Sequence, residues 1–293
     1  MTKDESEYVG RFAPSPSGPL HLGSLYIALA SYLDAKASAG RWLLRIEDID
    51  HFRCDSQYHD VILRSLEQFG LLWDGEVAIQ SQRLDEYQAA FDRLVADDRV
   101  YYCACTRKQL KPFSGVYPGF CRSKGLISSE ETSARVRIEN KAIGDVLIRR
   151  KDGQFAYQLV VVVDDALQGV THIIRGNDLL SSRPGQLSIQ ALLGYPKPQY
   201  RHFPVLVDRM GIKLSKQTGA RSVADFPVLA TLCWLLEALG LPDVRMRDFD
   251  SVSEVLRWAV QHWPAVDRSQ LDSLQLSSLQ DNSIVADWPP LHS

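Results

Sequence analysis

Two short polar motifs, far apart in the chain, contain side chains suited to holding a triphosphate. The first, His21-Leu-Gly-Ser24, precedes an apolar pattern typical of a helix. A helix N-terminus offers backbone N–H groups and a positive dipole, a histidine adds a donor, and Gly23 leaves room for a flat base. The second, Lys213-Leu-Ser-Lys216, places two ammonium groups and the Ser215 hydroxyl in a loop bounded by glycines. In such a loop these groups can stabilise the negative charge that develops on pyrophosphate as it leaves ATP. Alone, each motif is more often a surface histidine or a solvated basic turn, but together they predict an ATP site.

Three of the five cysteines lie close together in the sequence. Cys103 and Cys105 are separated by one residue, and Cys121 follows after 15 more. Soft thiolates at this spacing are typical of a structural zinc site, which needs four ligands. The spacing alone names no fourth ligand, and reduced thiols in a core are the alternative interpretation. Cys54 stands apart, and Cys233 lies in an apolar run that predicts a core position.

The composition is that of an ordinary globular chain. Its 293 residues are 45% hydrophobic and 24% charged, and 33 Lys and Arg against 36 Asp and Glu give a net charge of −3. This composition excludes a fibre and a low-complexity chain. The nearly balanced charge excludes nucleic-acid binding through net charge, so any RNA contact needs a local patch of basic residues. The charged N-terminus lacks the apolar core of a secretory signal, and no apolar run is long enough to span a membrane. We therefore expect a cytoplasmic protein without a membrane partner.

The first motif sits in a predicted strand–loop–helix–strand unit. The pattern predicts a strand at 8–12, a proline-rich loop at 13–19, a helix with one buried stripe from Leu22 to Gly40, and a strand at 42–46. Acidic residues 47–50 then lie at a strand's carboxyl end. This arrangement predicts a βαβ unit with a parallel sheet, and therefore an α/β fold.

Further elements are predicted along the rest of the chain. The continuous β-branched run 155–163 indicates a strand buried on both faces. The other expected elements are helices at 58–69, 84–95 (with Ser81 as a candidate cap), 179–193, 228–239 and 252–260, and strands at 134–138, 145–148, 170–174 and 203–207, with a loose end at 283–293.

Four ordered motifs carry a resemblance to a known family. His21-Leu-Gly-Ser24 and Lys213-Leu-Ser-Lys-Gln217 resemble the two signatures of class I aminoacyl-tRNA synthetases. The segments 10–18 and 45–50, and then 155–157 with 175–178, resemble the glutamyl-tRNA synthetase branch of that class. The resemblance extends to about Ser222 and implies a Rossmann-like parallel-sheet catalytic domain. It assigns catalysis to His21, Gly23, Lys213, Ser215 and Lys216, and ATP binding to His21, Gly23, Ser24 and Lys216.

The same resemblance implies a glutamate pocket and a metal site. Its glutamate-binding positions correspond here to Arg11, Ser15, Glu47, Tyr157 and Arg175, which supply the cations, hydroxyls and acid that a ligand with two carboxylates and one ammonium requires. It also supplies Tyr117, through its phenolate oxygen, as the fourth zinc ligand beside Cys103, Cys105 and Cys121. Outside the pocket, His51-Phe52 stands where the family commonly has prolines, and the 122–144 segment is short for the family.

Only 76 residues follow the second motif, which leaves no room for the anticodon-binding region of ordinary glutamyl-tRNA synthetases. The truncated paralogues, the glutamyl-queuosine tRNA(Asp) synthetase family, are therefore the best match. We expect a first catalytic half at 1–97, a zinc-containing insertion at 98–154, a second catalytic half at 155–208, and the lysine loop with a helical stem-contact extension at 209–293.

Membership would imply formation of glutamyl-adenylate from L-glutamate and ATP without tRNA. Glutamate is then transferred to the queuosine base at the wobble position of tRNA(Asp). Neither step needs a side-chain nucleophile, and Mg²⁺ is expected on the ATP phosphates. We expect a monomer with one structural zinc ion per chain. The rival hypotheses are a glutamate ligase acting on another acceptor and a non-catalytic, zinc-containing RNA-binding or regulatory protein with this fold.

Overall fold

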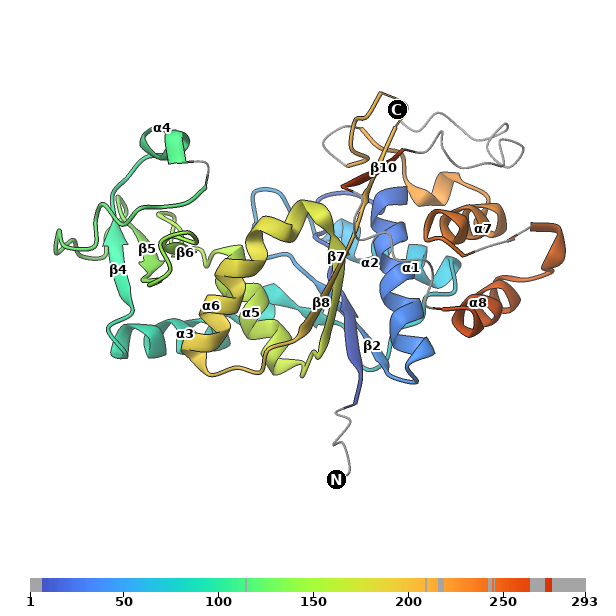
Figure 1. Cartoon of the computed structure of the whole chain (residues 1–293), viewed down its shortest axis with the longest axis horizontal. Helices are drawn as coiled ribbons and strands as arrows, with labels where there is room; N and C mark the ends of the chain where they lie inside the picture. Colours follow the sequence, from blue (N-terminus) through green and yellow to red (C-terminus); the bar gives the residue numbers. More distant parts are fainter. Residues whose placement is uncertain are drawn as a thin grey trace. The chain divides into compact units, whose positions relative to one another are not determined.

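The computed structural model describes residues 7–113, 115–208, 210–215, 219–241, 244, 246–263 and 272–275. Two compact units make up the chain (Figure 1). The first comprises Met1–Ile79, Val170–Leu180 and Pro198–Ser293, and the second Gln80–Gly169 and Ser181–Lys197. The four-part division expected from the sequence stays a prediction. No helix in the described ranges combines the length and hydrophobicity that crossing a membrane requires.

The parallel sheet of the first unit confirms the predicted βαβ unit. Strand β1 (Val9–Phe12), helix α1 (Leu22–Ala37) and strand β2 (Arg41–Ile46) follow one another, and β1 pairs with β2 in parallel from Val9↔Arg41 to Phe12↔Leu44. Strand β3 (Ala78–Ile79) pairs in parallel with β2 on its other side, and β7 (His172–Gly176) pairs in parallel with β8 (Gln199–Phe203). The Thr171 amide donates to the Val9 carbonyl at 2.9 Å, so β7 adjoins β1.

Helix α1 is more deeply buried than its sequence indicated. The helix is confirmed, but the single apolar stripe is wrong, because residues on several faces are buried, including Tyr26, Ser31 and Ala35. Small residues let neighbouring elements pack close to its other faces. At Gly40, a Cβ would overlap the carbonyl oxygen of Tyr8, which accepts the Arg41 amide at 2.9 Å. Only glycine fits where the chain turns from α1 into β2.

Helix α5 (Tyr157–Leu167) overturns the strand predicted at 155–163. Leu159 to Val163 are all 2% exposed or less, so the helix is buried around most of its circumference. A short apolar run of this kind does not distinguish a buried strand from a buried helix, and the β-branched residues favoured the wrong choice. Asp164 and Asp165, which follow this run, also lie within the helix and are buried.

Asp164 anchors α5 inside the second unit. Its carboxylate is completely buried and accepts from Gln80 Nε2 at 2.8 Å, Arg83 Nη1 at 3.1 Å and Tyr87 OH at 3.0 Å. These donors come from η1 (Gln80–Gln82), helix α3 (Leu84–Ala96) and the residue before it. Arg83, not Ser81, is the residue at the N-cap of α3, so the predicted cap is wrong.

Replacing Asp164 by asparagine should destabilise the second unit strongly. The change leaves Arg83 facing a neutral amide and turns one acceptor into a donor, at a cost of about 3 kcal/mol in the free energy of unfolding. Chemical denaturation followed by circular dichroism measures the loss. Asp92→Asn, on the exposed face of α3, is the matched control and should change stability by less than about 0.5 kcal/mol. Equal stability of the two variants would contradict the anchoring role.

A small antiparallel sheet lies within the predicted insertion. Strands β4 (Val100–Cys103), β5 (Ser133–Val136) and β6 (Val146–Arg149) pair in that order, with α4 (Arg107–Leu110) and η2 (Lys111–Phe113) between β4 and β5. The second unit also contains α6 (Arg183–Leu193), which packs against α5.

The chain contains further helices and a second pair of parallel strands. Helices α7 (Val228–Ala238) and α8 (Val252–Gln261) confirm the two helices predicted in the tail and pack against each other, and α8 also packs on α1 (Figure 1). The other elements are α2 (Gln57–Gln68), η3 (Asn177–Ser182), η5 (Val223–Asp225), η6 (Met246–Asp248) and the parallel pair β9 (Val205–Val207) and β10 (Ser273–Gln275). The predicted loose end at 283–293 lies outside the described residues.

Candidate active site

The first phosphate motif occupies the N-terminus of α1, as predicted. His21 is the N-cap residue, with extended backbone angles, and its Nδ1 accepts a hydrogen bond from the Ser24 amide at 3.3 Å. An accepting Nδ1 places the proton of the neutral ring on Nε2. The histidine therefore both caps the helix and presents a donor beside the helix's positive end.

The second motif lies directly against the first. A Cβ built on Gly23 would lie 3.3 Å from the Leu214 carbonyl oxygen and 3.1 Å from the His21 ring. Lys213 forms an antiparallel bridge with Val207, and the Leu214 amide donates to the Leu206 carbonyl at 3.0 Å. Residues 23 and 214 are thus neighbours in space, although they lie 191 positions apart in the sequence.

Asp178 holds the first lysine of the loop. Lys213 Nζ lies 2.7 Å from Asp178 Oδ2, and both side chains are partly exposed. The Ala220 amide donates to the Ser215 carbonyl at 3.1 Å, which closes the loop behind the motif. Lys216 and Gln217 lie outside the described residues.

Gly23→Ala should weaken ATP binding without unfolding the chain. The added methyl group must displace either the His21 ring or the Leu214 carbonyl by a few tenths of an ångström, and we expect about a tenfold higher KM for ATP. Steady-state kinetics at saturating glutamate measures the change, with the melting temperature as the folding control. A KM equal to that of the unmodified protein would contradict the close approach of the two motifs.

Three neighbouring strands end with the charged residues of the predicted glutamate pocket. Arg11 in β1 and Arg175 in β7 are 5% and 4% exposed, and Glu47 directly follows β2. Arg11 Nη1 donates to the Ile174 carbonyl at 3.4 Å, beside Arg175. The carboxyl ends of parallel strands share one edge of a sheet, where ligands of such folds bind. Two arginines and one glutamate therefore lie near the carboxyl ends of three neighbouring strands.

The loop after β1 is tied to the end of β2. The Glu47 amide donates to the Pro14 carbonyl at 3.0 Å, next to the predicted pocket residue Ser15, which is exposed. Ser15 therefore lies near the strand end that carries Glu47. Tyr157, the other predicted pocket residue, begins α5 in the second unit and is partly buried. Its place in the pocket stays a prediction.

The sequence did not predict the side chains that contact the charged residues of the predicted pocket. Arg45 is completely buried and its Nη2 lies 3.1 Å from Glu47 Oε1. Arg175 Nε donates to His202 Nε2 at 3.1 Å, and His202 is itself buried. A lone arginine inside the apolar strand 42–46 was a usable signal for Arg45, since arginine is rarely buried unpaired. No comparable signal in the sequence pointed to His202.

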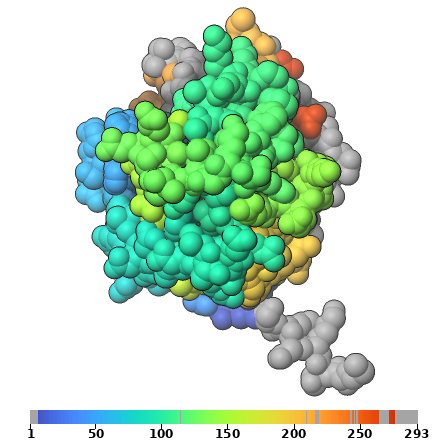
Figure 2. Space-filling view, turned by 90° about the vertical axis from the view of Figure 1, so that its left-hand side faces the viewer, coloured from blue at the N-terminus to red at the C-terminus, as the bar shows by residue number. Residues whose placement is uncertain are grey.

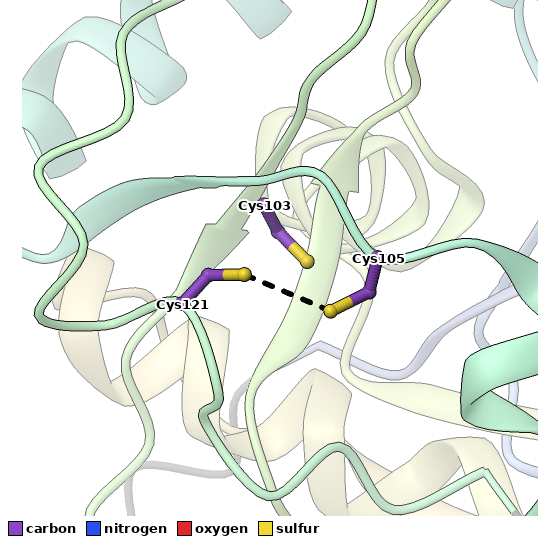
Figure 3. A group of neighbouring side chains, drawn as sticks. All are labelled: Cys103, Cys105 and Cys121. Atoms are coloured by element: carbon purple, nitrogen blue, oxygen red, sulfur yellow. Dashed lines mark hydrogen bonds between the residues drawn. The ribbon is translucent and has the colours of Figure 1, made fainter.

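The cysteine cluster forms a compact group in the second unit. The sulfur atoms of Cys103, Cys105 and Cys121 all lie within 4.8 Å of one another, and Cys105 Sγ is 3.6 Å from Cys121 Sγ (Figure 3). The Tyr117 hydroxyl lies 3.3 Å from Cys103 Sγ and 3.6 Å from Cys105 Sγ. The predicted set of three sulfurs and one oxygen is therefore assembled in space.

Burial and hydrogen bonds shift the pKa values of the thiols and the phenol in the cluster. Burial raises the pKa of the Cys121 thiol, but hydrogen bonds from Tyr117, the Ala104 backbone and the neighbouring thiols outweigh it and lower that pKa to about 7. Burial raises the pKa values of Cys105 and Tyr117. The Arg135 guanidinium lies 4.0 Å from the Tyr117 ring centre, a cation–π contact that fixes the ring. Among the described residues, this is the one group of three or more metal-ligating side chains.

Comparison with known proteins identifies the family. The family model of class I tRNA synthetases (E and Q), catalytic domain, matches residues 7–115 and 122–255. The glutamyl-Q tRNA(Asp) synthetase of Thiobacillus denitrificans is 46% identical over 279 residues, which cover 87% of this chain and 93% of that protein. That of Aromatoleum aromaticum is 47% identical over 89% of this chain and 90% of its own length. This chain belongs to the glutamyl-Q tRNA(Asp) synthetase family. It is a ligase of the aminoacyl-tRNA synthetase type.

Solved structures share the family's fold. A glutamate tRNA ligase from Elizabethkingia meningosepticum superposes with a TM-score of 0.72 at 22% identity, covering 92% of this chain and 67% of that one. The methionyl-tRNA synthetase of Mycobacterium tuberculosis gives 0.57 at 13% identity, covering 78% and 64%. The match to the family model leaves out residues 116–121, which include Tyr117 and Cys121.

Proposed function

We propose that this ligase activates L-glutamate with ATP in the absence of tRNA and transfers it to the queuosine base at the wobble position of tRNA(Asp). The proposed acceptor is taken from the names of the relatives. The proposed chemistry is supported by one structural observation. That observation is the position of Arg11, Arg175 and Glu47 near the carboxyl ends of three neighbouring strands, β1, β7 and β2. A cytoplasmic location would place the enzyme with its tRNA.

Glutamate has the charge pattern that this edge complements. A guanidinium binds a carboxylate through two parallel hydrogen bonds, and two guanidiniums serve the two carboxylates of the substrate. Glu47 is assigned to the substrate ammonium, with Arg45 fixing its carboxylate. Ser15 and Tyr157 contribute hydroxyl groups. A substrate without a second carboxylate or without the ammonium would desolvate these charged side chains and supply no matching group, so the site would reject it.

In the first step a carboxylate oxygen of glutamate attacks the α-phosphorus of ATP, and the bond to pyrophosphate breaks. His21, Gly23 and Ser24 hold the nucleotide at the N-terminus of α1, while Lys213, Ser215 and Lys216 stabilise the charge that moves onto pyrophosphate. Mg²⁺ bound to phosphate oxygens supplies further charge neutralisation. In the second step a hydroxyl of the acceptor attacks the mixed anhydride, and AMP leaves as glutamate is transferred.

We assign one structural zinc ion to Cys103, Cys105, Tyr117 and Cys121. With zinc–sulfur bonds of about 2.3 Å, the sulfurs of a tetrahedral site lie about 3.8 Å apart, close to the separation of Cys105 and Cys121. A divalent cation favours the deprotonated forms of its ligands, which compensates for the burial of the phenol and thiols. Four protein ligands close the site, so the ion would stabilise the insertion and take no part in the chemical steps.

The acceptor assignment is tested by glutamate transfer to matched tRNAs. Labelled glutamate should reach tRNA(Asp) that contains queuosine, and also the same tRNA after removal of its 3′-terminal adenosine. The same tRNA without queuosine should accept no label. Transfer that requires the 3′ adenosine would contradict the proposal and indicate an ordinary glutamyl-tRNA synthetase activity.

A further inference from the structure

The lysine motif follows directly on a hairpin that begins in β9. Backbone contacts pair the two arms of this hairpin, and they join Asp208 to Ile212 (amide to carbonyl, 2.9 Å), Val207 to Lys213 (an antiparallel bridge) and Leu214 to Leu206 (amide to carbonyl, 3.0 Å). We call residues 205–208 and 210–214 the lysine hairpin. Met210, at its turn, is 83% exposed, and orange atoms of this part of the chain reach the upper edge of the view in Figure 2.

The register of the lysine hairpin decides which way its second arm faces. Leu214 is 2% exposed and belongs to the same apolar core as Leu206. The next side chain along the arm, Lys213, is 45% exposed and lies 2.7 Å from Asp178. Because side chains of an extended arm alternate between its two faces, a slip of one position would turn the lysine inward and the leucine outward. The place of the lysine motif therefore depends on this register.

The carboxylate of Asp208 closes the turn of the lysine hairpin. Asp208 is 8% exposed, and its Oδ1 accepts hydrogen bonds from the Met210 and Ile212 amides, both at 2.8 Å. The Gly211 amide donates to the Asp208 carbonyl at 3.1 Å. Bonds from amides to a charged oxygen are stronger than those between neutral groups, and an aspartate that bonds the backbone after it favours one turn geometry. This side chain therefore selects the turn that sets the register.

We propose that Asp208 is a positioning residue for glutamate activation, and that it acts by fixing the register of the lysine hairpin and with it the place of the lysine motif. The hairpin meets the nucleotide end of α1 at its second arm, where the Leu214 carbonyl approaches Gly23. Stabilisation of charge in a transition state requires groups that are held in place beforehand, and a shift of about 1 Å can cost a large part of the rate. The inference rests on the proposed function, from which it takes the reaction.

Pyrophosphate exchange with glutamate tests this role. Asp208→Ala should lower kcat about tenfold and leave the KM for glutamate unchanged, because the proposed glutamate pocket lies on other strands. Asp208→Asn retains an oxygen that accepts both amides, so its kcat should stay within about twofold of the unmodified value. The matched control is Asp152→Ala, which removes an aspartate that accepts the Gln154 amide in an exposed turn elsewhere, and it should exchange at the normal rate.

A double variant separates positioning from a general loss of stability. If Asp208 acts through the lysine motif, adding Asp208→Ala to Lys216→Ala should slow exchange by only about twofold, because the lysine whose place it fixes is already gone. If Asp208 only stabilised the fold, the two losses would multiply to about a hundredfold. A multiplied loss would therefore overturn the inference.

Hydrogen exchange of the hairpin amides decides the structural part without any activity. In the absence of ATP and glutamate, a peptide that spans 205–215 should take up deuterium at least about tenfold faster in Asp208→Ala than in Asp208→Asn or in the unmodified protein. Equal uptake by the alanine and asparagine variants would overturn the inference. Absence of glutamate-dependent exchange in the unmodified protein would instead refute the proposed function.

Discussion

Lys216→Ala is expected to slow glutamate-dependent pyrophosphate exchange at least about tenfold, on the scale of one lost charge contact in a transition state. In the proposed mechanism this lysine stabilises the negative charge that accumulates on pyrophosphate, so kcat should fall while the KM for glutamate stays nearly constant. Leu214, two positions before this lysine, lies against Gly23 at the N-terminus of α1, where the proposal places the nucleotide. Exchange kinetics at varied glutamate and ATP separates the two parameters.

The matched control is Lys197→Ala, which removes an exposed lysine from the second unit and should exchange at the normal rate. If Lys216→Ala exchanged as fast as this control, the lysine loop would have no part in the chemical step.

Removing one thiol of the cysteine cluster should abolish metal binding. For Cys103→Ala we expect elemental analysis to show about zero zinc per chain, against about one in the unmodified protein, because a structural site with three ligands loses most of its affinity. The insertion should also melt at a lower temperature, since the variant loses the contact between Cys103 Sγ and the Tyr117 hydroxyl.

Cys54→Ala serves as the control, because Cys54 lies outside the cluster and donates to the Glu47 carbonyl. It should retain its zinc. Freshly prepared, reduced protein without bound metal would refute the zinc assignment, and full zinc content in Cys103→Ala would refute the ligand set.

Local signals in the sequence sufficed for the first half of the parallel sheet. Apolar periodicity and the stop at Gly40 located α1, and the strands on either side followed from their short apolar runs. The same reasoning failed at 155–163, because β-branched residues fit both a buried strand and a buried helix. The helix depends on tertiary contacts. The Asp164 carboxylate accepts hydrogen bonds from Gln80 and Tyr87, and the sequence pattern does not predict that these residues lie beside it.

The candidate site, too, could be predicted only in part from the sequence. Residues within recognisable motifs, such as His21 and Glu47, could be named from the sequence. Their partners could not, because Asp178 reaches Lys213 across 35 positions and His202 reaches Arg175 across 27. Such long-range pairs depend on strand order and register, which set which side chains meet.

The central claim, that this chain activates glutamate without RNA, is tested most directly by exchange of labelled pyrophosphate into ATP with RNA rigorously removed. Glutamine and aspartate provide matched substrates, since one lacks the side-chain charge and the other is a methylene shorter. Exchange with glutamate alone is the predicted result, because in the proposed pocket the two buried arginines, Arg11 and Arg175, bind two carboxylates at the separation that glutamate has. Exchange that is absent, or that begins only when tRNA is added, would contradict the account.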